Sequence, residues 1–433
     1  MERKTRVQAH CLEKLNKEYF EINHKSGLKA YVFPEKSFHT CYGIIGTSFG
    51  SVNSSFKLEG EESFSSVPDG IAHYLEHKLF ESEDGEDTFL KYARFGACAN
   101  AYTSFDRTCY LFSCSKYSKE CLGVLLDSVT HPYFTDENVE KERGIIGQEI
   151  EMYNDDPFWR SSFNLLVSAY KNNPIKTDIA GSVESIKNIT PENLYRCYNS
   201  FYSLNNMVLA VSGNIELEDV LEVMDENLEE KALVKVTNER FPEPEEVNKK
   251  EIRQTLPVSV PLYEIGYKGR YGYYEGKAEN KIVDAILSQI IIDETTDLYN
   301  ELYQKGIINN AFGADLMQGE DYSILMFAGE GDNAYEVKER IDQRINELKK
   351  NGISDEEFNR IKKILYNSTI GALSTPESVS SFFLGAGLNG VSPNELIKKS
   401  LDITKEMVYD RLITNYDTER SCVSIIDAPK END

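Results

Sequence analysis

The sequence predicts an α+β protein of two domains. Its 433 residues exceed the usual size of one compact domain, and two domains of about 200 residues each are the ordinary expectation for this length. Stretches of β-branched and aromatic residues that predict strands alternate with stretches whose apolar residues recur at helical spacing. Apolar residues form 40% of the chain and aromatic residues 11%, which is enough for sizeable cores.

The chain is strongly acidic, with 72 Asp and Glu against 47 Lys and Arg and a net charge of -25. Nucleic acid requires a basic face and an anionic membrane surface would repel this charge, so neither is an expected partner. The charge is compatible with basic or neutral peptide substrates, although an acidic excess more often only solvates a surface.

No feature of the sequence predicts secretion or membrane insertion. Residues 1–11 carry charges without the apolar core of a secretory signal, and no stretch approaches the ~20 apolar residues of a membrane span. The 8 cysteines are scattered and form no Cys-x-x-Cys pair, which favours reduced, buried thiols over a disulfide framework. We therefore expect a cytoplasmic protein.

The first predicted elements are strands at residues 28–35 and 40–49, which are rich in β-branched and aromatic residues. Residues 51–67 are rich in Ser, Gly and Glu and predict a loop. A helix is expected over residues 69–81, with Asp69 as its N-terminal cap.

The helix at 69–81 contains His73, Glu76 and His77 in the order His-x-x-Glu-His. Two histidines four residues apart project from one face of a helix, as two imidazoles on one metal ion require. Glu76 then lies close enough to contact a water on that metal. This order is the inverted zincin signature. The alternative is a helix in which two of the chain's 6 histidines have this spacing by chance.

A short helix is expected before Phe95, after a break at residues 83–88, and a hairpin over residues 99–115 with its turn near Asp106. The first strand of the hairpin is small and polar, which suits the edge of a sheet. Such an edge could pair with an extended peptide. An ordinary edge strand explains the composition equally well.

The second informative segment is residues 135–157, a predicted helix that Thr135 caps. A spacing of about 100° per residue places Glu142 and Glu149 within an apolar stripe of this helix. Carboxylates on such a stripe are costly unless a cation meets them. Glu149 is therefore the candidate third metal ligand, with Glu142 in support. Glu151 competes as a ligand but faces solvent, and partial exposure of the stripe remains the alternative.

Two imidazoles, one carboxylate and an open position form the usual catalytic arrangement for zinc, of which we expect one ion per chain. The expected ligands are His73, His77 and Glu149. A zinc-bound water in the open position would lose its proton to Glu76 and attack a polarised peptide carbonyl. Glu76 would then pass the proton to the leaving amine.

The second half of the chain begins a similar pattern. A helix at 214–229 closes a first domain (1–229), residues 230–257 form a charged linker that contains prolines, and a second domain (258–433) follows. Its expected elements are strands at 260–267, 307–314, 321–329 and 421–426 and helices at 279–292, 334–350 and 354–370. Because His131 is the last histidine, this domain cannot build a second site of the same kind.

The chain resembles the pitrilysin, insulysin and mitochondrial processing peptidase family of inverted zincins, in the form of a small, half-length, bacterial-type subunit. The motifs that carry the resemblance are His73-Tyr-Leu-Glu76-His77, Glu142-Arg-Gly-Ile-Ile-Gly-Gln-Glu149, Asn100-Ala101, Ile179-Ala-Gly-Ser-Val-Glu-Ser-Ile186 and Asn206-Met-Val-Leu-Ala-Val-Ser-Gly-Asn214. The seven-residue spacing of the two glutamates is also the family's. These motifs cover nearly the whole first half.

The resemblance implies a role for each matched residue and a fold. The residues are the zinc ligands His73, His77 and Glu149, the base Glu76, the supporting Glu142, and Asn100 and Ala101, which would hold the substrate backbone as an added strand. The implied fold is two homologous halves, each a mostly antiparallel sheet packed by helices.

One pair of family residues does not occur in this chain. Active members carry an Arg and a Tyr in a second-half domain, where they hold the substrate carbonyl and the oxyanion. The matching positions here are Leu302 and Asn309, and no Arg occurs between Arg270 and Arg340. The resemblance therefore implies a heterodimer in which a homologous, zinc-free subunit supplies the pair, or else a homodimer.

Two classes of function remain open. The favoured one is a zinc metalloendopeptidase that cleaves short, unfolded peptides and needs a sister subunit for full activity. The alternative is a largely non-proteolytic assembly or maturation factor that keeps the zinc site. Glu76 favours catalysis, because a structural zinc needs no base. A metal hydrolase acting on another bond has no sequence feature of its own.

Overall fold

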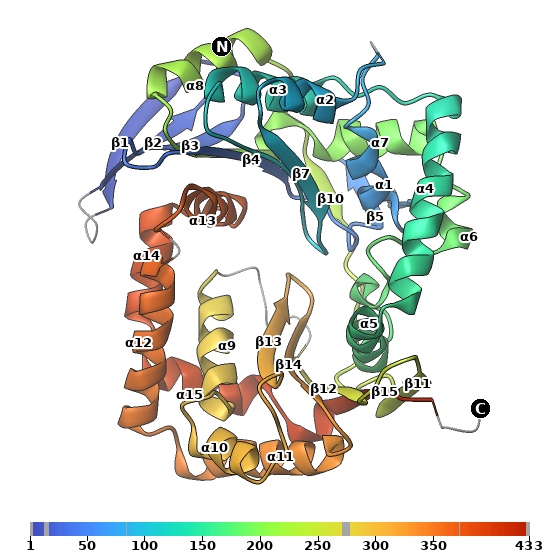
Figure 1. Cartoon of the computed structure of the whole chain (residues 1–433), viewed down its shortest axis with the longest axis vertical. Helices are drawn as coiled ribbons and strands as arrows, with labels where there is room; N and C mark the ends of the chain where they lie inside the picture. Colours follow the sequence, from blue (N-terminus) through green and yellow to red (C-terminus); the bar gives the residue numbers. More distant parts are fainter. Residues whose placement is uncertain (1–2, 13–16, 84, 271–277, 372, 430–433) are drawn as a thin grey trace. The chain divides into compact units, whose positions relative to one another are not determined.

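The structure, a computed structural model, contains two compact units and describes residues 3–12, 17–83, 85–270, 278–371 and 373–429 (Figure 1). Each unit combines a β-sheet with packed helices, so the predicted α+β class is confirmed. The first unit gathers Met1–Gln148, Asp178–Glu239 and Thr369–Leu396, and the second gathers Glu149–Thr177, Arg240–Ser368 and Ile397–Asp433.

The first unit is built on a seven-stranded sheet, counted over the described residues, with the order β1-β2-β3-β9-β4-β8-β7. Its strands are β1 (Arg6–Leu12), β2 (Lys17–Asn23), β3 (Lys29–Pro34), β4 (Cys41–Thr47), β7 (Cys98–Thr103), β8 (Thr108–Cys114) and β9 (Met207–Gly213). β3 and β9 are parallel, and the other neighbours are antiparallel. Every residue of β4 and β9 is buried, as expected for strands covered on both faces.

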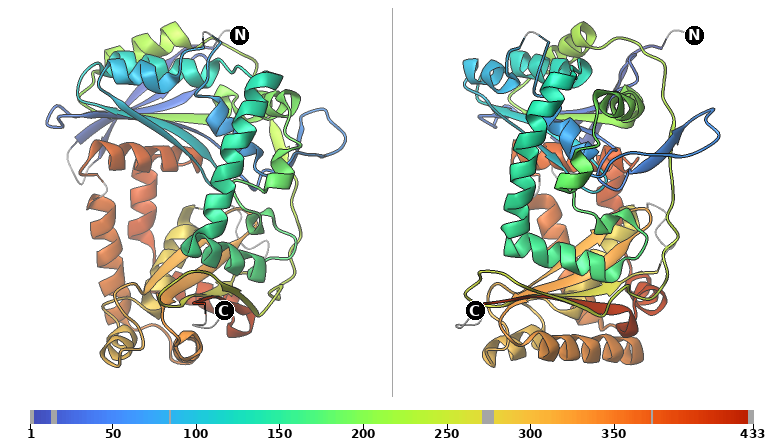
Figure 2. Two further views of the ribbon diagram at one scale, coloured as in Figure 1. Left: turned by 45° about the vertical axis from the view of Figure 1, so that its right-hand side comes forward. Right: turned by 90° about the vertical axis from the view of Figure 1, so that its right-hand side faces the viewer.

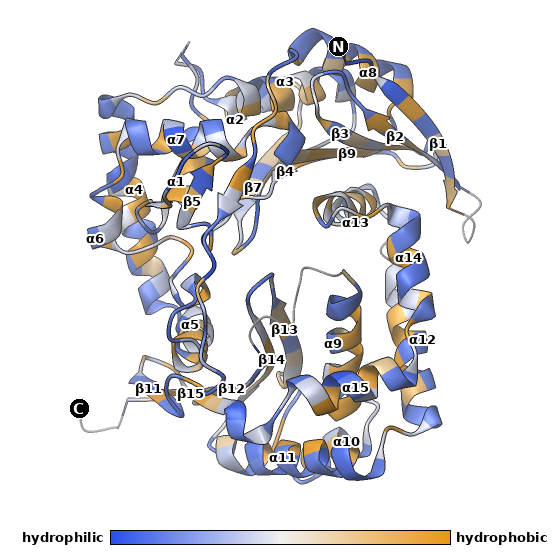
Figure 3. Ribbon diagram, turned by 180° about the vertical axis from the view of Figure 1, so that it is seen from behind, coloured by the Kyte–Doolittle hydropathy of each residue, from blue (hydrophilic) through white to orange (hydrophobic). Residues whose placement is uncertain are grey.

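Helices cover both faces of this sheet (Figure 2). α3 (Ser118–Thr130) and α8 (Leu217–Asn227) pack on one face, and α13 (Pro376–Leu388) packs on the other. The ring centroid of Phe383 in α13 lies 4.9 Å from that of Tyr19 and 5.9 Å from that of Tyr31. In Figure 3, β3 and β9, which lie between the helix layers, are coloured as hydrophobic. Aromatic and aliphatic burial therefore holds this unit together.

A small sheet of order β10-β5-β6 also belongs to the first unit, with β5 (Ser55–Leu58), β6 (Ser65–Ser66) and β10 (Val236–Asn238). The prediction of a loop over residues 51–67 is therefore wrong at β5 and β6. Phe56 of β5 is fully buried, and its ring centroid lies 4.7 Å from that of Phe201. This tertiary contact overrides a local composition that favours a loop.

The second unit is built on a five-stranded sheet, within the described part of the chain, of order β11-β15-β12-β14-β13. Its strands are β11 (Glu251–Thr255), β12 (Leu262–Lys268), β13 (Gly313–Gln318), β14 (Ser323–Glu330) and β15 (Ser421–Asp427). Alternation along β12 separates the two faces. Gly266 lies against Leu165 of α5 (Pro157–Ala169), whereas Ile265 and Tyr267 face the hydrophobic core.

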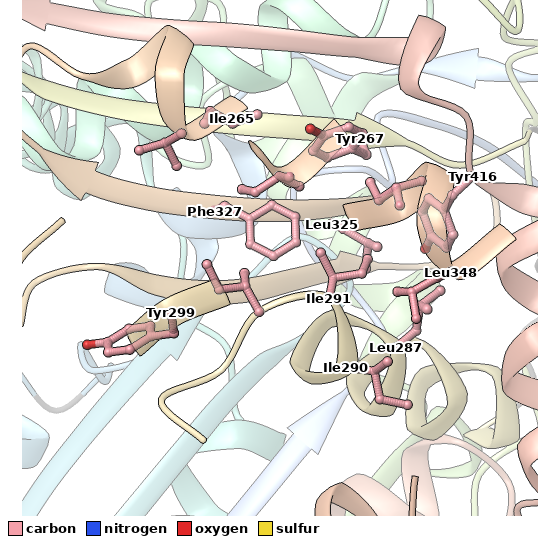
Figure 4. Close-up of a cluster of buried hydrophobic side chains, with 14 of the residues drawn as sticks. Ile265, Tyr267, Leu287, Ile290, Ile291, Tyr299, Leu325, Phe327, Leu348 and Tyr416 are labelled. Carbon is pink, nitrogen blue, oxygen red and sulfur yellow. The ribbon is translucent and has the colours of Figure 1, made fainter. Parts of the chain in front are cut away.

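That core includes residues of β12, β14 and β15 and of the helices α9 (Ala278–Ile291), α10 (Asp297–Gln304), α11 (Ala334–Asn351), α12 (Asp355–Gly371) and α15 (Lys405–Asn415). Figure 4 shows Leu287, Ile290 and Ile291 of α9 beside Leu325 and Phe327 of β14. The remaining α-helices of the described chain are α1 (Ile71–Lys78), α2 (Thr88–Arg94), α4 (Asp136–Asp155), α6 (Val183–Ile186), α7 (Pro191–Phe201) and α14 (Pro393–Asp402).

The predicted strand at 307–314 is wrong over most of its length. Ile307 and Ile308 are buried in the core directly after α10, and β13 begins only at Gly313. These two apolar residues contribute to the core from a loop. The predicted helices at 334–350 and 354–370 agree with α11 and α12.

The two sheets share one topology. The order β11-β15-β12-β14-β13 repeats β3-β9-β4-β8-β7, and in both the first pair is parallel and the next three are antiparallel. α5 follows the long helix α4 as α13 follows the long helix α12. The repeated order agrees with two homologous halves.

The compact units nevertheless differ from a simple division of the chain. The predicted division, 1–229 and 258–433 joined by a linker at 230–257, cuts the chain once. Residues 149–177 precede the linker but belong to the second unit, because α5 packs on the second sheet. Residues 369–396 follow the linker but belong to the first unit, because α13 packs on the first sheet. As a boundary between homologous halves, the linker stays a prediction.

Part of the linker is held by buried polar contacts of the second unit. The carboxylate of Glu243 accepts the backbone N–H groups of Lys171, Asn172 and Asn173 at 2.6, 2.7 and 2.8 Å. The Nζ of Lys268 donates to the same carboxylate at 3.0 Å, and both side chains are almost fully buried. Such a pair is tolerated because every charge has several hydrogen bonds.

Within the described ranges, no helix is both long and apolar enough to cross a membrane. The cysteines are free thiols. Most are buried, as expected, whereas Cys11 on β1 and Cys98 on β7 are exposed because both strands lie at an edge of the sheet.

Glu264 of β12 is a buried carboxyl group. The hydroxyl of Ser162 donates to its Oε1 at 2.6 Å. Burial raises the pKa of Glu264 to about 7; the Ser162 hydrogen bond lowers it in part and the charge of Asp315 raises it further. The folded protein therefore holds a proton at Glu264 that the unfolded chain releases at lower pH.

Glu264 should make stability depend on pH between its ordinary pKa of 4.5 and about 7. A raised carboxyl pKa contributes stability below 4.5, and this contribution is lost as the pH rises through 7. Urea unfolding of Glu264→Gln should show a loss of stability between pH 5 and pH 8 that is smaller than the wild-type loss by roughly 3 kcal/mol. The exposed Glu339→Gln variant should follow the wild type. Equal pH dependence in all three proteins would contradict the assignment.

Candidate metal centre

The N-terminus of α1 is set by a glycine rather than by the predicted Asp69 cap. Gly70 precedes the helix with φ 88°, and no side chain caps it. A Cβ on Gly70 would lie 2.4 Å from the carbonyl oxygen of Ala180, and a Cβ on Gly181 would lie 2.6 Å from that of Asp69. The hydroxyl of Ser185 also donates to the Asp69 carbonyl at 2.9 Å. Close approach of two backbones therefore replaces a side-chain cap.

α1 is almost entirely buried and is fastened to the first turn of α4. Its residues are buried except His77, which is half-buried. The hydroxyl of Tyr74 donates to the carbonyl of Val139. The buried ammonium of Lys78 donates to the carbonyl of Asn138 at 3.1 Å and to Glu81 at 2.6 Å. These contacts fix the distance between the two helices.

α4 has the predicted cap and the predicted buried stripe. The hydroxyl of Thr135 accepts the N–H of Asn138 at 3.2 Å, and the Asn138 side chain accepts the N–H of Thr135 at 2.9 Å. Along the helix, Glu142 is buried, Glu149 is half-buried and Glu151 is exposed. The helical period thus places Glu149 on the buried side of α4 and Glu151, the alternative ligand, in solvent.

His73 and His77 from α1 and Glu149 from α4 converge. One ligand atom from each lies within 4.8 Å of the other two, and no other such group of three occurs among the residues described. Donors bound to one zinc ion at about 2.0–2.2 Å lie no more than roughly 4.4 Å apart, a few tenths of an ångström less than the 4.8 Å within which these three atoms fall. Two imidazoles and one carboxylate are also donors that suit zinc.

A second layer of side chains orients two of these donors. The Nδ1 of His77 lies 2.9 Å from Oε1 of Glu142, which leaves Nε2 as the donor atom for a metal. Burial raises the pKa of Glu142, but the hydrogen bond and charge of His77, with nearby lysines, outweigh burial and hold the pKa below its ordinary value. Glu142 is thereby kept as a carboxylate next to His77.

The hydroxyl of Tyr153 donates to Oε1 of Glu149 at 2.7 Å. Trp159 stacks on Tyr153 with ring centroids 4.5 Å apart and an interplanar angle of 16°. Neither Tyr153 nor Trp159 was among the predicted site residues. The signal for Tyr153 was its position four residues after Glu149, which places the two side chains on the same face of α4.

Glu76 lies on α1 between the two histidines in sequence and is buried. The hydroxyl of Thr103 donates to its Oε2 at 2.6 Å. Thr103 ends β7, and sequence reasoning missed it because no local pattern links residue 103 to residue 76. Glu76 is not one of the three converging donors.

β7 is the predicted edge strand, and this position is confirmed because β7 ends the sheet and, among the described strands, pairs with β8 alone. Asn100 is exposed, and its side-chain oxygen accepts the backbone N–H of Ala101 at 2.9 Å. Both residues therefore lie on a strand with an open side. Their part in holding a substrate stays a prediction.

Leu302 cannot replace the missing Arg, and Asn309 offers an amide where the Tyr would offer a phenol. Leu302 is fully buried in the core of the second unit. Asn309 is exposed, and its amide donates to Glu330 at 3.1 Å. A leucine in a core offers no donor to a substrate carbonyl, so the first of the two positions has a structural role here.

Comparisons with known proteins match both halves of the chain. A family model described as "Insulinase (Peptidase family M16)" matches residues 64–183, and one described as "Peptidase M16 inactive domain" matches residues 188–365. A Bacillus subtilis protein named "Uncharacterized zinc protease YmfH" is 35% identical over 92% of this chain and 93% of its own length.

Two further similarities concern a eukaryotic protein and a solved structure. "Mitochondrial-processing peptidase subunit beta" of Caenorhabditis elegans is 29% identical over 36% of this chain and 36% of its own length. A solved structure described as an M16-like peptidase from Alicyclobacillus acidocaldarius has a TM-score of 0.89 and 29% identity, and the match covers 99% of this chain and 100% of that one.

The close approach of Gly70 to the Ala180–Gly181 backbone predicts a large cost for a methyl group at Gly70. Gly70→Ala should lower the free energy of unfolding by about 2–4 kcal/mol, because the backbone conformation and the backbone contact both exclude a Cβ. Gly144→Ala is the matched control, since a Cβ there meets nothing within 4 Å. In denaturant unfolding it should be neutral or stabilise by up to about 1 kcal/mol. Similar stability of the two variants would contradict the role given to Gly70.

Proposed function

The chain belongs to the insulinase family, peptidase family M16, and on this basis we propose that it is a zinc-dependent endopeptidase that cleaves short, unfolded peptides. The convergence of His73, His77 and Glu149 beside the buried carboxylate of Glu76 is the observation that carries the proposal. A metal that served only as structure would need no such carboxylate beside it.

His73, His77 and Glu149 would hold one zinc ion, and Glu142 would keep the His77 ring in the orientation for binding. A zinc ion in this place supplies Lewis-acid chemistry, through the lowered pKa of a coordinated water and the polarisation of a peptide carbonyl. Tyr153 would restrain Glu149 through the hydrogen bond to its Oε1.

Glu76 would act as general base and then as general acid. It takes a proton as the oxygen of water bonds to the carbonyl carbon of the peptide. It returns that proton to the nitrogen as the carbon–nitrogen bond breaks, so that an amine and a carboxylate leave. Its buried position and the Thr103 hydrogen bond hold the carboxylate during both transfers.

The open side of β7 would bind the substrate as an added strand. Such pairing needs an extended, unpaired backbone, which a short, unfolded peptide presents more readily than a folded protein does, and this favours short, unfolded peptides. Asn100 and Ala101 would contact the substrate backbone, and the Asn100 side chain would release the N–H of Ala101 for this purpose.

A homologous, zinc-free subunit, or a second copy of the chain, would complete the site. The support is the identity of Leu302, a core residue, and of Asn309 at the positions where active relatives of the resembled family carry Arg and Tyr. The partner would supply the groups that hold the substrate carbonyl and the oxyanion.

Glu76→Gln should abolish turnover without removing the metal. In cleavage of a quenched fluorescent peptide library by the chain with its sister subunit, the variant should lose roughly 10²–10⁴-fold in kcat/KM. Zinc content by mass spectrometry should match that of the wild type. Glu151→Gln, on the exposed face of α4, is the control and should retain activity.

Peptide cleavage that is unchanged in Glu76→Gln or in the presence of a metal chelator would contradict the zinc peptidase proposal. A wild-type complex that binds zinc and its sister subunit but cleaves no peptide of a broad library would favour the assembly or maturation role.

Trp159 should report zinc binding, because the chain has 1 tryptophan and it stacks on the tyrosine that holds Glu149. Addition of Zn²⁺ to the metal-free protein should change the tryptophan emission in a saturable way. Tyr153→Phe should weaken zinc binding by about 10–100-fold in a chelator competition. His131→Ala, which removes an exposed histidine, should leave the affinity unchanged. Equal zinc affinity in the wild type and both variants would contradict a role of Tyr153 in zinc binding.

A further inference from the structure

Thr103, the last residue of the edge strand β7, contacts the proposed general base Glu76. Its hydroxyl donates to Oε2 of Glu76 at 2.6 Å. An ionised carboxylate only accepts hydrogen bonds, so the single hydroxyl proton of Thr103 is committed to Glu76. This contact links β7, the strand proposed to hold the peptide, to α1, the helix of the His-x-x-Glu-His motif.

The end of β7 is rigid around Thr103. Thr108, its partner across the hairpin, is fully buried, and its hydroxyl donates to the carbonyl of Phe49 at 2.8 Å. The two threonine oxygens are 3.4 Å apart, and because each proton is already committed, this is a packing contact. The N–H of Ser104 donates to the carbonyl of Arg107 at 2.8 Å and closes the turn.

A second set of backbone contacts fastens the same turn to the segment after β4. The N–H of Ser51 donates to the carbonyl of Ser104 at 3.1 Å, and that of Val52 donates to Phe105 at 3.0 Å. A Cβ on Gly50 would lie 2.4 Å from the Ser104 oxygen, so the backbones touch. The backbone at Thr103 is thus positioned by the sheet and this turn, and the side chain of Thr103 reaches α1.

Side chains alternate along β7, and the pattern relates Thr103 to the peptide. Residues 99, 101 and 103 are half-buried, and residues 98, 100 and 102 are exposed. Ala101 and Thr103 therefore share the face that contacts α1. A peptide paired beside Asn100 and Ala101 would lie within two residues of the threonine that holds the base.

We propose that Thr103 is a positioning residue that couples the edge strand β7 to the orientation of the Glu76 carboxylate. This inference rests on the proposed peptidase function. The hydrogen bond fixes one oxygen of Glu76 relative to the strand that carries the substrate, so that base and scissile bond keep one geometry through proton uptake and proton delivery. A misplacement of about 1 Å in such a geometry costs on the order of 10²-fold in rate.

Thr103→Val removes the hydroxyl and keeps the shape of the side chain. With the sister subunit present and a quenched peptide as substrate, kcat should fall about 10–100-fold, with KM within about 3-fold of the wild type. Thr103→Ser should restore kcat to within about 3-fold, because it returns the donor. Asn100→Ala should instead raise KM, which separates strand pairing from base orientation. If Thr103→Val does not fold, Thr103→Ala against Thr103→Ser gives the same contrast.

A double-mutant cycle tests whether Thr103 acts through Glu76. In the Glu76→Gln background, Thr103→Val should cause no further loss of the residual rate. Wild-type kcat in Thr103→Val, or a full additional loss in the Glu76→Gln background, overturns the inference while the peptidase function stands. Absence of any chelator-sensitive cleavage by the wild type overturns the proposed function, and the inference with it.

Discussion

The packing of α1 against α4 is the constraint on which the candidate metal centre depends. α1 buries a lysine, a glutamate and a histidine, and such burial is costly unless each polar group has a partner. α4 supplies the carbonyl of Asn138 to Lys78, the carbonyl of Val139 to Tyr74 and the carboxylate of Glu142 to His77. Glu76 has its partner on β7, in the hydroxyl of Thr103. The same contacts that offset the cost of burial therefore set the position of His77 relative to Glu149.

This constraint explains why the donor set could be predicted from the sequence. The spacing of His73 and His77 and the period of α4 are local helical properties, and both helices formed where expected. The same period placed Glu151 in solvent and Glu149 on the buried side. The edge position of β7 also followed from its small, polar composition.

The features that were missed depend on residues far apart in the chain. Asp69 is a good capping residue by type. The N-cap of α1 is instead Gly70, because the backbone of Ala180 and Gly181 lies too close to leave room for a Cβ there. β5 and β6 depend on burial of Phe56 against Phe201, and the contact of Thr103 with Glu76 crosses from a strand to a helix. No periodicity within one segment records such contacts.

The exchange of α5 and α13 between the halves has a consequence for the order in which the protein can mature. Synthesis through residue 229 completes the strands β1 to β9, yet Tyr19 and Tyr31 still lack Phe383, which follows about 150 residues later. Conversely, α5 is made before the strands β11 to β15 on which it packs. Neither sheet can bury both of its faces while the ribosome still holds the C-terminal helices. During synthesis an apolar face of a sheet therefore stays exposed to solvent and accessible to chaperones, until about the last hundred residues have left the ribosome.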